Sequence, residues 1–146
     1  MRHLSFVPTE VLRTLVGSSA EEVDQLERDL GLAIPAALRE YLLTMGESPP
    51  NSEYYHHGTL EMKYMQDWLG DWVKRYRAEG VPLPGMDNAI PFLQFQDTFF
   101  YVLAGTYRDD PPAYAFDIND TPTIRLLHDR FTDFVVKQWG HKGQPR

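Results

Sequence analysis

Two adjacent histidines, His56 and His57, are the residues that most readily suggest chemistry, because imidazole is a common metal ligand. Metal motifs usually place two histidines on one face of an element, as positions i and i+4 do on a helix. Neighbouring residues point in divergent directions, so one ion would need further ligands from His3, His128 or His141. The pattern favours an exposed polar loop, and we expect no metal site.

Asp117 and Asp120 come nearest to a carboxylate cluster in the sequence. They flank an Ile-Asn pair between two predicted strands, where aspartate and asparagine are the usual turn-forming residues. A calcium-binding loop would need more oxygen ligands at alternate positions and a distant glutamate. We therefore interpret this segment as a turn.

Nucleophilic and phosphate-binding motifs are missing from the sequence. None of the serines lies in the G-x-S-x-G pattern of a nucleophile elbow, and the chain contains no cysteine. The ten glycines are scattered, mostly at predicted helix ends, instead of forming a phosphate-binding loop. We predict that the protein is not an enzyme and uses no cofactor.

Charge and hydropathy exclude further classes of protein. The 146 residues include 14 basic and 21 acidic side chains, a formal net charge of −7, whereas nucleic-acid binders cluster Lys and Arg. No apolar run is long enough to span a membrane. Pro8, Glu10 and Arg13 interrupt the N-terminal apolar stretch, which a secretory signal would need unbroken. We expect a cytoplasmic protein with neither a nucleic-acid nor a membrane partner.

Start and stop signals predict helices in the N-terminal half. Thr9 can cap a short helix over residues 10–16. Two overlapping capping boxes precede the next helix, Ser18 with Glu21 and Ser19 with Glu22. Gly31 fits the left-handed position that ends this helix. Pro35 can open the following one, which Gly46 ends.

The remaining elements are a loop, a long helix, two hairpins and a closing helix. Residues 47–58 read as a polar loop, and an apolar stripe predicts a helix over 61–79. Aromatic and β-branched runs predict strands over residues 90–95, 98–104, 113–118 and 123–127. Asp129 can cap a last helix that Gly140 ends, followed by a loose tail at 141–146.

This order predicts one α+β domain over residues 1–146, with its core at about 20–138. N-terminal helices precede a central, largely antiparallel sheet of about four to six strands, and a C-terminal helix closes the fold. Neither a repeat nor an interdomain linker interrupts the chain.

Aromatic and acidic residues supply the candidates for partner binding. Trp68 and Trp72 lie one turn apart in the predicted long helix, where a stripe facing the core is the favoured interpretation. Tyr54 and Tyr55 lie in a polar loop and are harder to bury; exposed tyrosines suit protein interfaces. Negative charge would come from the loop residues Asp109 and Asp110.

The segment EEVDQLERDLGLAIPAALREYLLTMGES resembles the opening signature of the SUKH superfamily, named for a fungal glucan-synthesis regulator and its bacterial relatives. The residues that match this signature are Leu30, Gly31, Pro35, Tyr41, Leu42 and Gly46. Further along, Phe131 and Phe134 match the closing Phe-x-x-Phe helix, and the resemblance extends over about residues 20–138. Met45 replaces the usual asparagine before the glycine, and the turn at residues 96–97 is shorter than usual in the superfamily.

This resemblance implies a mixed α+β fold and, in bacteria, an immunity protein that neutralises a toxin domain, often a nuclease, by direct binding. No catalytic residues carry over from the superfamily. The excess of acidic side chains suits a basic toxin, because opposite charges accelerate encounter. Two alternatives stay open: a regulatory or scaffold module with a non-toxin protein partner, and a metal hydrolase using His56 and His57.

Overall fold

A computed structural model describes residues 2–47 and 56–143, with residues 56, 57 and 139–143 described by their backbone alone. The helices and strands follow one another in this order: α1 (Thr9–Leu12), α2 (Ala20–Leu30), α3 (Ala36–Met45), β1 (His56–His57), α4 (Thr59–Ala78), the 3-10 turn η1 (Met86–Asn88), β2 (Ala89–Phe95), β3 (Thr98–Leu103), β4 (Ala113–Asp117), β5 (Thr123–His128) and α5 (Phe131–Gly143).

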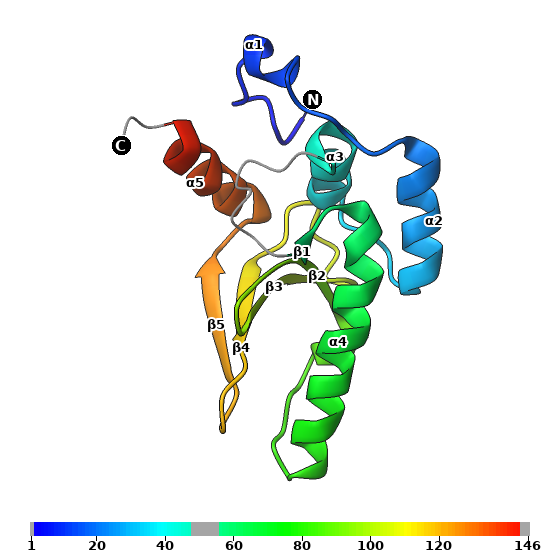
Figure 1. The fold of residues 1–146 in the computed structure, drawn as a ribbon, viewed down its shortest axis with the longest axis vertical. Helices are drawn as coiled ribbons and strands as arrows, with labels where there is room; N and C mark the ends of the chain where they lie inside the picture. The colour runs from blue at the N-terminus through cyan, green and yellow to red at the C-terminus, as the bar shows by residue number, and fades with distance from the viewer. Residues whose placement is uncertain (1, 48–55, 144–146) are drawn as a thin grey trace.

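The strands form one antiparallel sheet in chain order, β1-β2-β3-β4-β5. Four of them are long, and the two-residue β1 extends the sheet beside β2. The predicted α+β fold, with a sheet of about four to six antiparallel strands and a closing helix, is therefore confirmed. Figure 1 shows the curved sheet with α4 running along it and α2 beside α4.

Helices α4 and α5 pack on opposite faces of the sheet. Successive side chains of a strand point to opposite faces of the sheet, so Phe99 and Phe100 of β3 mark its two faces. Tyr76 of α4 contacts Phe116, the register partner of Phe99, with ring centroids 6.1 Å apart. Phe134 of α5 contacts Phe100 at 5.4 Å. The sheet is thus covered by α4 on one face and by α5 on the other.

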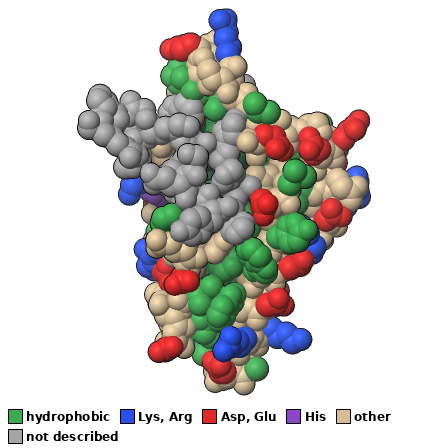
Figure 2. Space-filling view, viewed as in Figure 1, with side chains coloured by type: hydrophobic (Ala, Val, Ile, Leu, Met, Phe, Trp, Pro, Cys, Tyr) green, Lys and Arg blue, Asp and Glu red, His purple; other side chains and the backbone are tan. Residues whose placement is uncertain are grey.

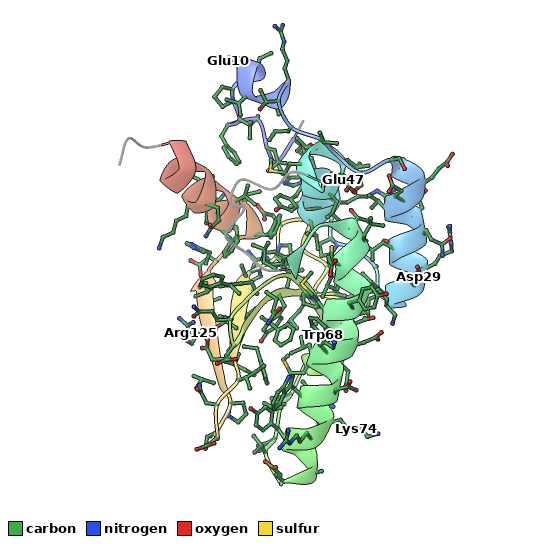
Figure 3. All side chains as sticks on the ribbon, viewed as in Figure 1. Glu10, Asp29, Glu47, Trp68, Lys74 and Arg125 are labelled. Atoms are coloured by element: carbon green, nitrogen blue, oxygen red, sulfur yellow. The ribbon has the colours of Figure 1, made fainter. Side chains whose placement is uncertain are left out.

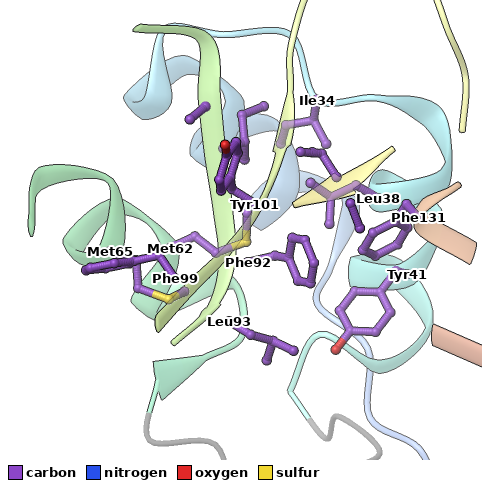
Figure 4. Packing of buried hydrophobic residues seen from close by; sticks show 14 of the residues in the cluster. Ile34, Leu38, Tyr41, Met62, Met65, Phe92, Leu93, Phe99, Tyr101 and Phe131 are labelled. Atoms are coloured by element: carbon purple, nitrogen blue, oxygen red, sulfur yellow. The ribbon is translucent and has the colours of Figure 1, made fainter. Parts of the chain in front are cut away.

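The core contains the apolar members of the superfamily signature. Tyr41 and Phe131 meet edge to face at 5.5 Å, and Phe92 meets Phe131 at 5.0 Å, so α3, β2 and α5 share one aromatic cluster. Figure 4 shows this cluster beside Leu38, with Met62 and Met65 of α4 lying apart from it near Phe99. The signature residues with large apolar side chains, Leu30, Tyr41, Leu42, Phe131 and Phe134, are all buried.

The predicted helix caps are confirmed in part. The Ser19–Glu22 capping box is present, and its hydrogen bonds from the Ser19 backbone and side chain lower the pKa of Glu22. Gly31 ends α2 with φ +69°, as predicted, and Pro35 precedes α3. The proposed Ser18–Glu21 box was wrong, because the Ser18 hydroxyl is buried between α3 and α4, where it contacts the Thr59 hydroxyl.

Two helices and one strand differ from the prediction by more than one or two residues at an end. The first helix covers only Thr9–Leu12, with Pro8 at its N-cap and no cap from the Thr9 hydroxyl. His56 and His57 form a strand within the predicted loop, because their backbones pair with Gln94 and Leu93 of β2. Helix α5 continues to Gly143, beyond its expected end at Gly140, and residues 144–146 lie outside the described residues.

Candidate protein-binding surface

The structure shows where the backbone of the histidine pair lies. The backbones of His56 and His57 lie in an edge strand, and their side chains are outside the described residues. Over the described ranges, no three His, Asp or Glu side chains gather in a way that could hold a metal ion. In the same part of the chain, none of the helices combines the length and apolar character that crossing a bilayer requires.

Asp117 is an ionised, hydrogen-bonded acceptor in the sheet. It accepts hydrogen bonds from Nε of Arg125 at 2.6 Å and from the Thr98 hydroxyl at 2.7 Å. The hydrogen bonds from Arg125 lower the pKa of Asp117, and the contact with Thr98 lowers it further. A carboxyl group held ionised in this way links β3, β4 and β5 and is poorly suited to act as a general acid at neutral pH.

Asp109 and Asp110 tie the β3–β4 loop to two helices. The backbone carbonyl of Asp109 accepts a hydrogen bond from the amide of Ala37, at the start of α3, at 2.8 Å. Asp110 accepts hydrogen bonds from both the amide and the hydroxyl of Thr132, in the first turn of α5. Asp110 therefore caps α5, and the prediction that Asp129 does so was wrong.

Replacing Asp110 with alanine is expected to lower the free energy of unfolding by about 1–2 kcal/mol, the usual cost of losing a helix cap. Asp109→Ala is the matched control. Its side chain is 58% exposed and forms a surface ion pair with Arg2, while its backbone bond would remain. We expect a change of about 0.5 kcal/mol or less for the control. Urea denaturation followed by circular dichroism measures both, and equal losses would contradict the capping role of Asp110.

Four large apolar side chains form a ridge on α4, and three of them are exposed. Its members are spaced four residues apart, and their exposed fractions fall along the helix: 71% for Leu60, 62% for Tyr64 and 42% for Trp68, with Trp72 half-buried. We call these four residues the α4 ridge. In Figure 2, hydrophobic side chains gather over α4 with acidic side chains around them.

The prediction that the tryptophan stripe faces the core was wrong for the first part of the ridge. The buried face of α4 consists of Met62, Met65, Leu69, Val73 and Tyr76. A row spaced four residues apart advances about 40° around the helix at each step, since each residue turns about 100°. The ridge therefore starts on the outside of the helix at Leu60 and reaches the edge of the core only at Trp72.

Trp72 is fixed by its neighbours at the inner end of the ridge. Its ring stacks on Tyr76 with centroids 5.8 Å apart, and the guanidinium of Arg75 lies 5.3 Å from its centroid. The Tyr76 hydroxyl donates to the backbone carbonyl of Asn119 at 2.6 Å. These contacts line an open hollow of about 460 Å³ between α4 and the β4–β5 turn. Because Trp72 is already packed against these neighbours, a partner that binds there would lose less side-chain entropy.

Negative charge is concentrated beside the outer part of the ridge. Helix α2 carries five carboxylates and one arginine, and it packs against α4. On α4, Asp67 and Asp71 follow Tyr64 and Trp68 by three residues each, and residues at that spacing are neighbours on a helix surface. Figure 3 shows Asp29 of α2 on the same side of the molecule as Trp68, while Lys74 lies nearer the other end of α4. Asp67 and Asp71 thus flank the exposed apolar row, and α2 adds further carboxylates on the side of α4 that carries Gln66, which donates to the Leu30 carbonyl.

This architecture defines a class of protein: an α+β domain in which a helix on one face of an antiparallel sheet presents an apolar ridge. The chain belongs to the SMI1/KNR4 family (SUKH-1), whose family model matches residues 17–137. The match covers nearly the same part of the chain as the resemblance seen in the sequence, which confirms that resemblance. No curated protein matches the sequence.

The candidate residues chosen from the sequence do not coincide with the α4 ridge. Tyr54 and Tyr55 lie outside the described residues, while Asp109 and Asp110 belong to the β3–β4 loop, which is hydrogen-bonded to α3 and α5. Leu60 was not singled out. The sequence signal for the ridge was the constant four-residue spacing of Leu60, Tyr64 and Trp68. A buried helix face instead alternates steps of three and four residues.

Proposed function

We propose that this protein is a non-catalytic binding protein that neutralises a basic toxin domain, such as a nuclease, by direct contact in the cytoplasm. The observation that carries the proposal is the family match over residues 17–137. The superfamily resemblance implies immunity proteins among the bacterial members. The proposal agrees with the sequence, which contains no recognisable catalytic or cofactor-binding motif.

Charge supports a basic protein partner. The chain has a formal net charge of −7, and a nuclease toxin needs basic side chains to bind the phosphates of its substrate. Opposite charges accelerate the encounter of two proteins and disfavour wrong partners. Asp109, with its exposed side chain, and the tyrosines Tyr54 and Tyr55 remain our candidates for contacts outside α4.

Co-expression with a toxin domain encoded by a neighbouring gene is the direct test. We expect growth to be restored and the two purified chains to form a one-to-one complex. The association rate should fall by about tenfold or more between about 0.05 M and 0.5 M NaCl, because salt screens long-range attraction. A toxin with a disabled active site, co-expressed in parallel, controls for expression level.

Two outcomes would overturn the proposal. One is growth arrest that persists although both proteins are present and folded. The other is a complex with a neighbour-encoded protein that has no toxicity, which would favour the regulatory or scaffold function instead.

A further inference from the structure

We infer that the α4 ridge is the docking site for an amphipathic helix of the partner, with basic side chains flanking its apolar stripe. The inference rests on the proposed function in one respect, since it takes the partner to be a protein. It adds the surface used, the secondary structure of the bound segment and the distribution of its charge.

The shape of the ridge suits a helix. Leu60, Tyr64, Trp68 and Trp72 form an i+4 row about 18 Å long, at a rise of about 1.5 Å per residue. Rows of this kind are the ridges that fit into the grooves of a second helix in the commonest mode of helix packing. Tryptophan and tyrosine also contribute the largest share of binding energy in protein interfaces. The ridge is therefore long enough to pack against about three turns of a partner helix.

Charge decides between a basic helix and an acidic one. The exposed carboxylates of α2 are Glu21, Glu22, Asp24 and Asp29, and Asp67 and Asp71 lie beside the ridge on α4. Asp24 is ion-paired with Arg39 and Asp67 with Lys63, so the negative charge available to a partner comes mainly from the other four carboxylates. Basic side chains of the partner helix would lie over these groups beside Leu60, Tyr64 and Trp68. Beyond Trp72, Lys74 and Arg75 add positive charge to α4, while Arg77 is ion-paired with Asp87, so the basic segment of the partner belongs at the α2 end.

A second copy of the chain is a less favourable occupant. Each copy carries a net charge of −7, and like charges oppose self-association. A basic helix instead gains attraction from the same carboxylates. Charge complementarity thus selects a partner of opposite sign.

Two synthetic helical peptides of about 18 residues, each about 27 Å long, test the inference on the full-length protein. They share one leucine stripe and differ only in their flanking positions, which are lysine in one and glutamate in the other. Amide chemical shifts of the ¹⁵N-labelled protein locate the binding site. We expect the lysine peptide to perturb residues 60–72 and α2, and to bind about tenfold or more tightly than the glutamate peptide at low salt.

Variants of the protein then separate apolar from electrostatic contributions. Trp68→Ala should lower the affinity for the lysine peptide by about tenfold or more. Val136→Ala, at a position on α5 with a similar exposed fraction, should change this affinity by less than about twofold. Asp29→Lys and Glu10→Lys change the net charge equally. Only Asp29→Lys should weaken binding strongly, because Glu10 lies at the far end of the molecule from Trp68 in Figure 3. Tyr64→Ala replaces Trp68→Ala if the latter unfolds.

Several results would overturn the inference: equal affinity for the two peptides, no binding of either, perturbation of another surface, or a dimer of the protein that Trp68→Ala dissociates. The growth assay keeps the two proposals apart. Failure to neutralise the toxin, with peptide selectivity intact, refutes the proposed function alone. Full neutralisation by a Trp68→Ala variant that no longer distinguishes the peptides refutes this docking site alone.

Discussion

Replacing Phe131 with alanine is expected to lower the free energy of unfolding by about 3–5 kcal/mol. The Phe131 ring is fully buried, and it meets Tyr41 of α3 and Phe92 of β2 edge to face at 5.5 and 5.0 Å. Removing it leaves a cavity between three elements that are far apart in the chain. Urea denaturation with fluorescence and circular dichroism as independent probes measures the loss.

Val136→Ala is the matched control for this prediction. Val136 lies in the same helix but is 45% exposed, so we expect a change of about 0.5 kcal/mol. If Phe131→Ala cost no more than this control, α5 would not be part of the common core. The closing Phe-x-x-Phe of the superfamily would then need an explanation other than packing.

Local signals in the sequence predicted most of the elements correctly. Ser19 and Glu22 form the predicted capping box, and the two residues are only three positions apart. The paired strands of both hairpins follow from runs of aromatic and β-branched residues around short turns. Each of these features depends on residues that are close together in the chain.

The errors occurred where a residue finds its partner far along the chain. Asp129 is well placed in the sequence to cap α5, but Asp110, 22 residues before Thr132, accepts the amide instead. Ser18 would fit a capping box, yet its hydroxyl contacts Thr59, 41 residues away. A capping pattern indicates which side chains are able to cap a helix; the packing of distant segments decides which one does.

The position of the α4 ridge could not be derived from the sequence for a related reason. Apolar residues cover more than half of the circumference of α4, so its sequence is compatible with more than one buried face. Contacts with α2 and β2 select the face that contains Met65 and Leu69. The outer apolar row that remains, from Leu60 to Trp68, is then exposed. The four-residue spacing marks this row in the sequence, but the packed core decides that it is the exposed one.

Gly17→Ala is expected to lower the free energy of unfolding by about 2–4 kcal/mol, combining overpacking with weakened hydrogen bonds. A Cβ at this position would lie 1.8 Å from the backbone oxygen of Leu43, so one backbone segment would have to move. On either side, the Ser18 amide donates to the Leu42 carbonyl and the Glu47 amide donates to the Val16 carbonyl, each at 2.9 Å. Thermal and urea unfolding of the variant measure the effect.

Gly70→Ala is the opposite case and serves as the control. Gly70 lies within α4, where a Cβ would meet no atom within 4 Å, so alanine should stabilise the helix by about 0.5–1 kcal/mol. Opposite signs for the two variants would show that close backbone approach, and not the residue type, makes Gly17 necessary. The segment from Gly17 to Ser18 is hydrogen-bonded both to α3 and to Thr59 at the start of α4. If a Gly17→Ala variant stayed fully stable, this segment would not be what fixes α4, and with it the ridge, relative to α3.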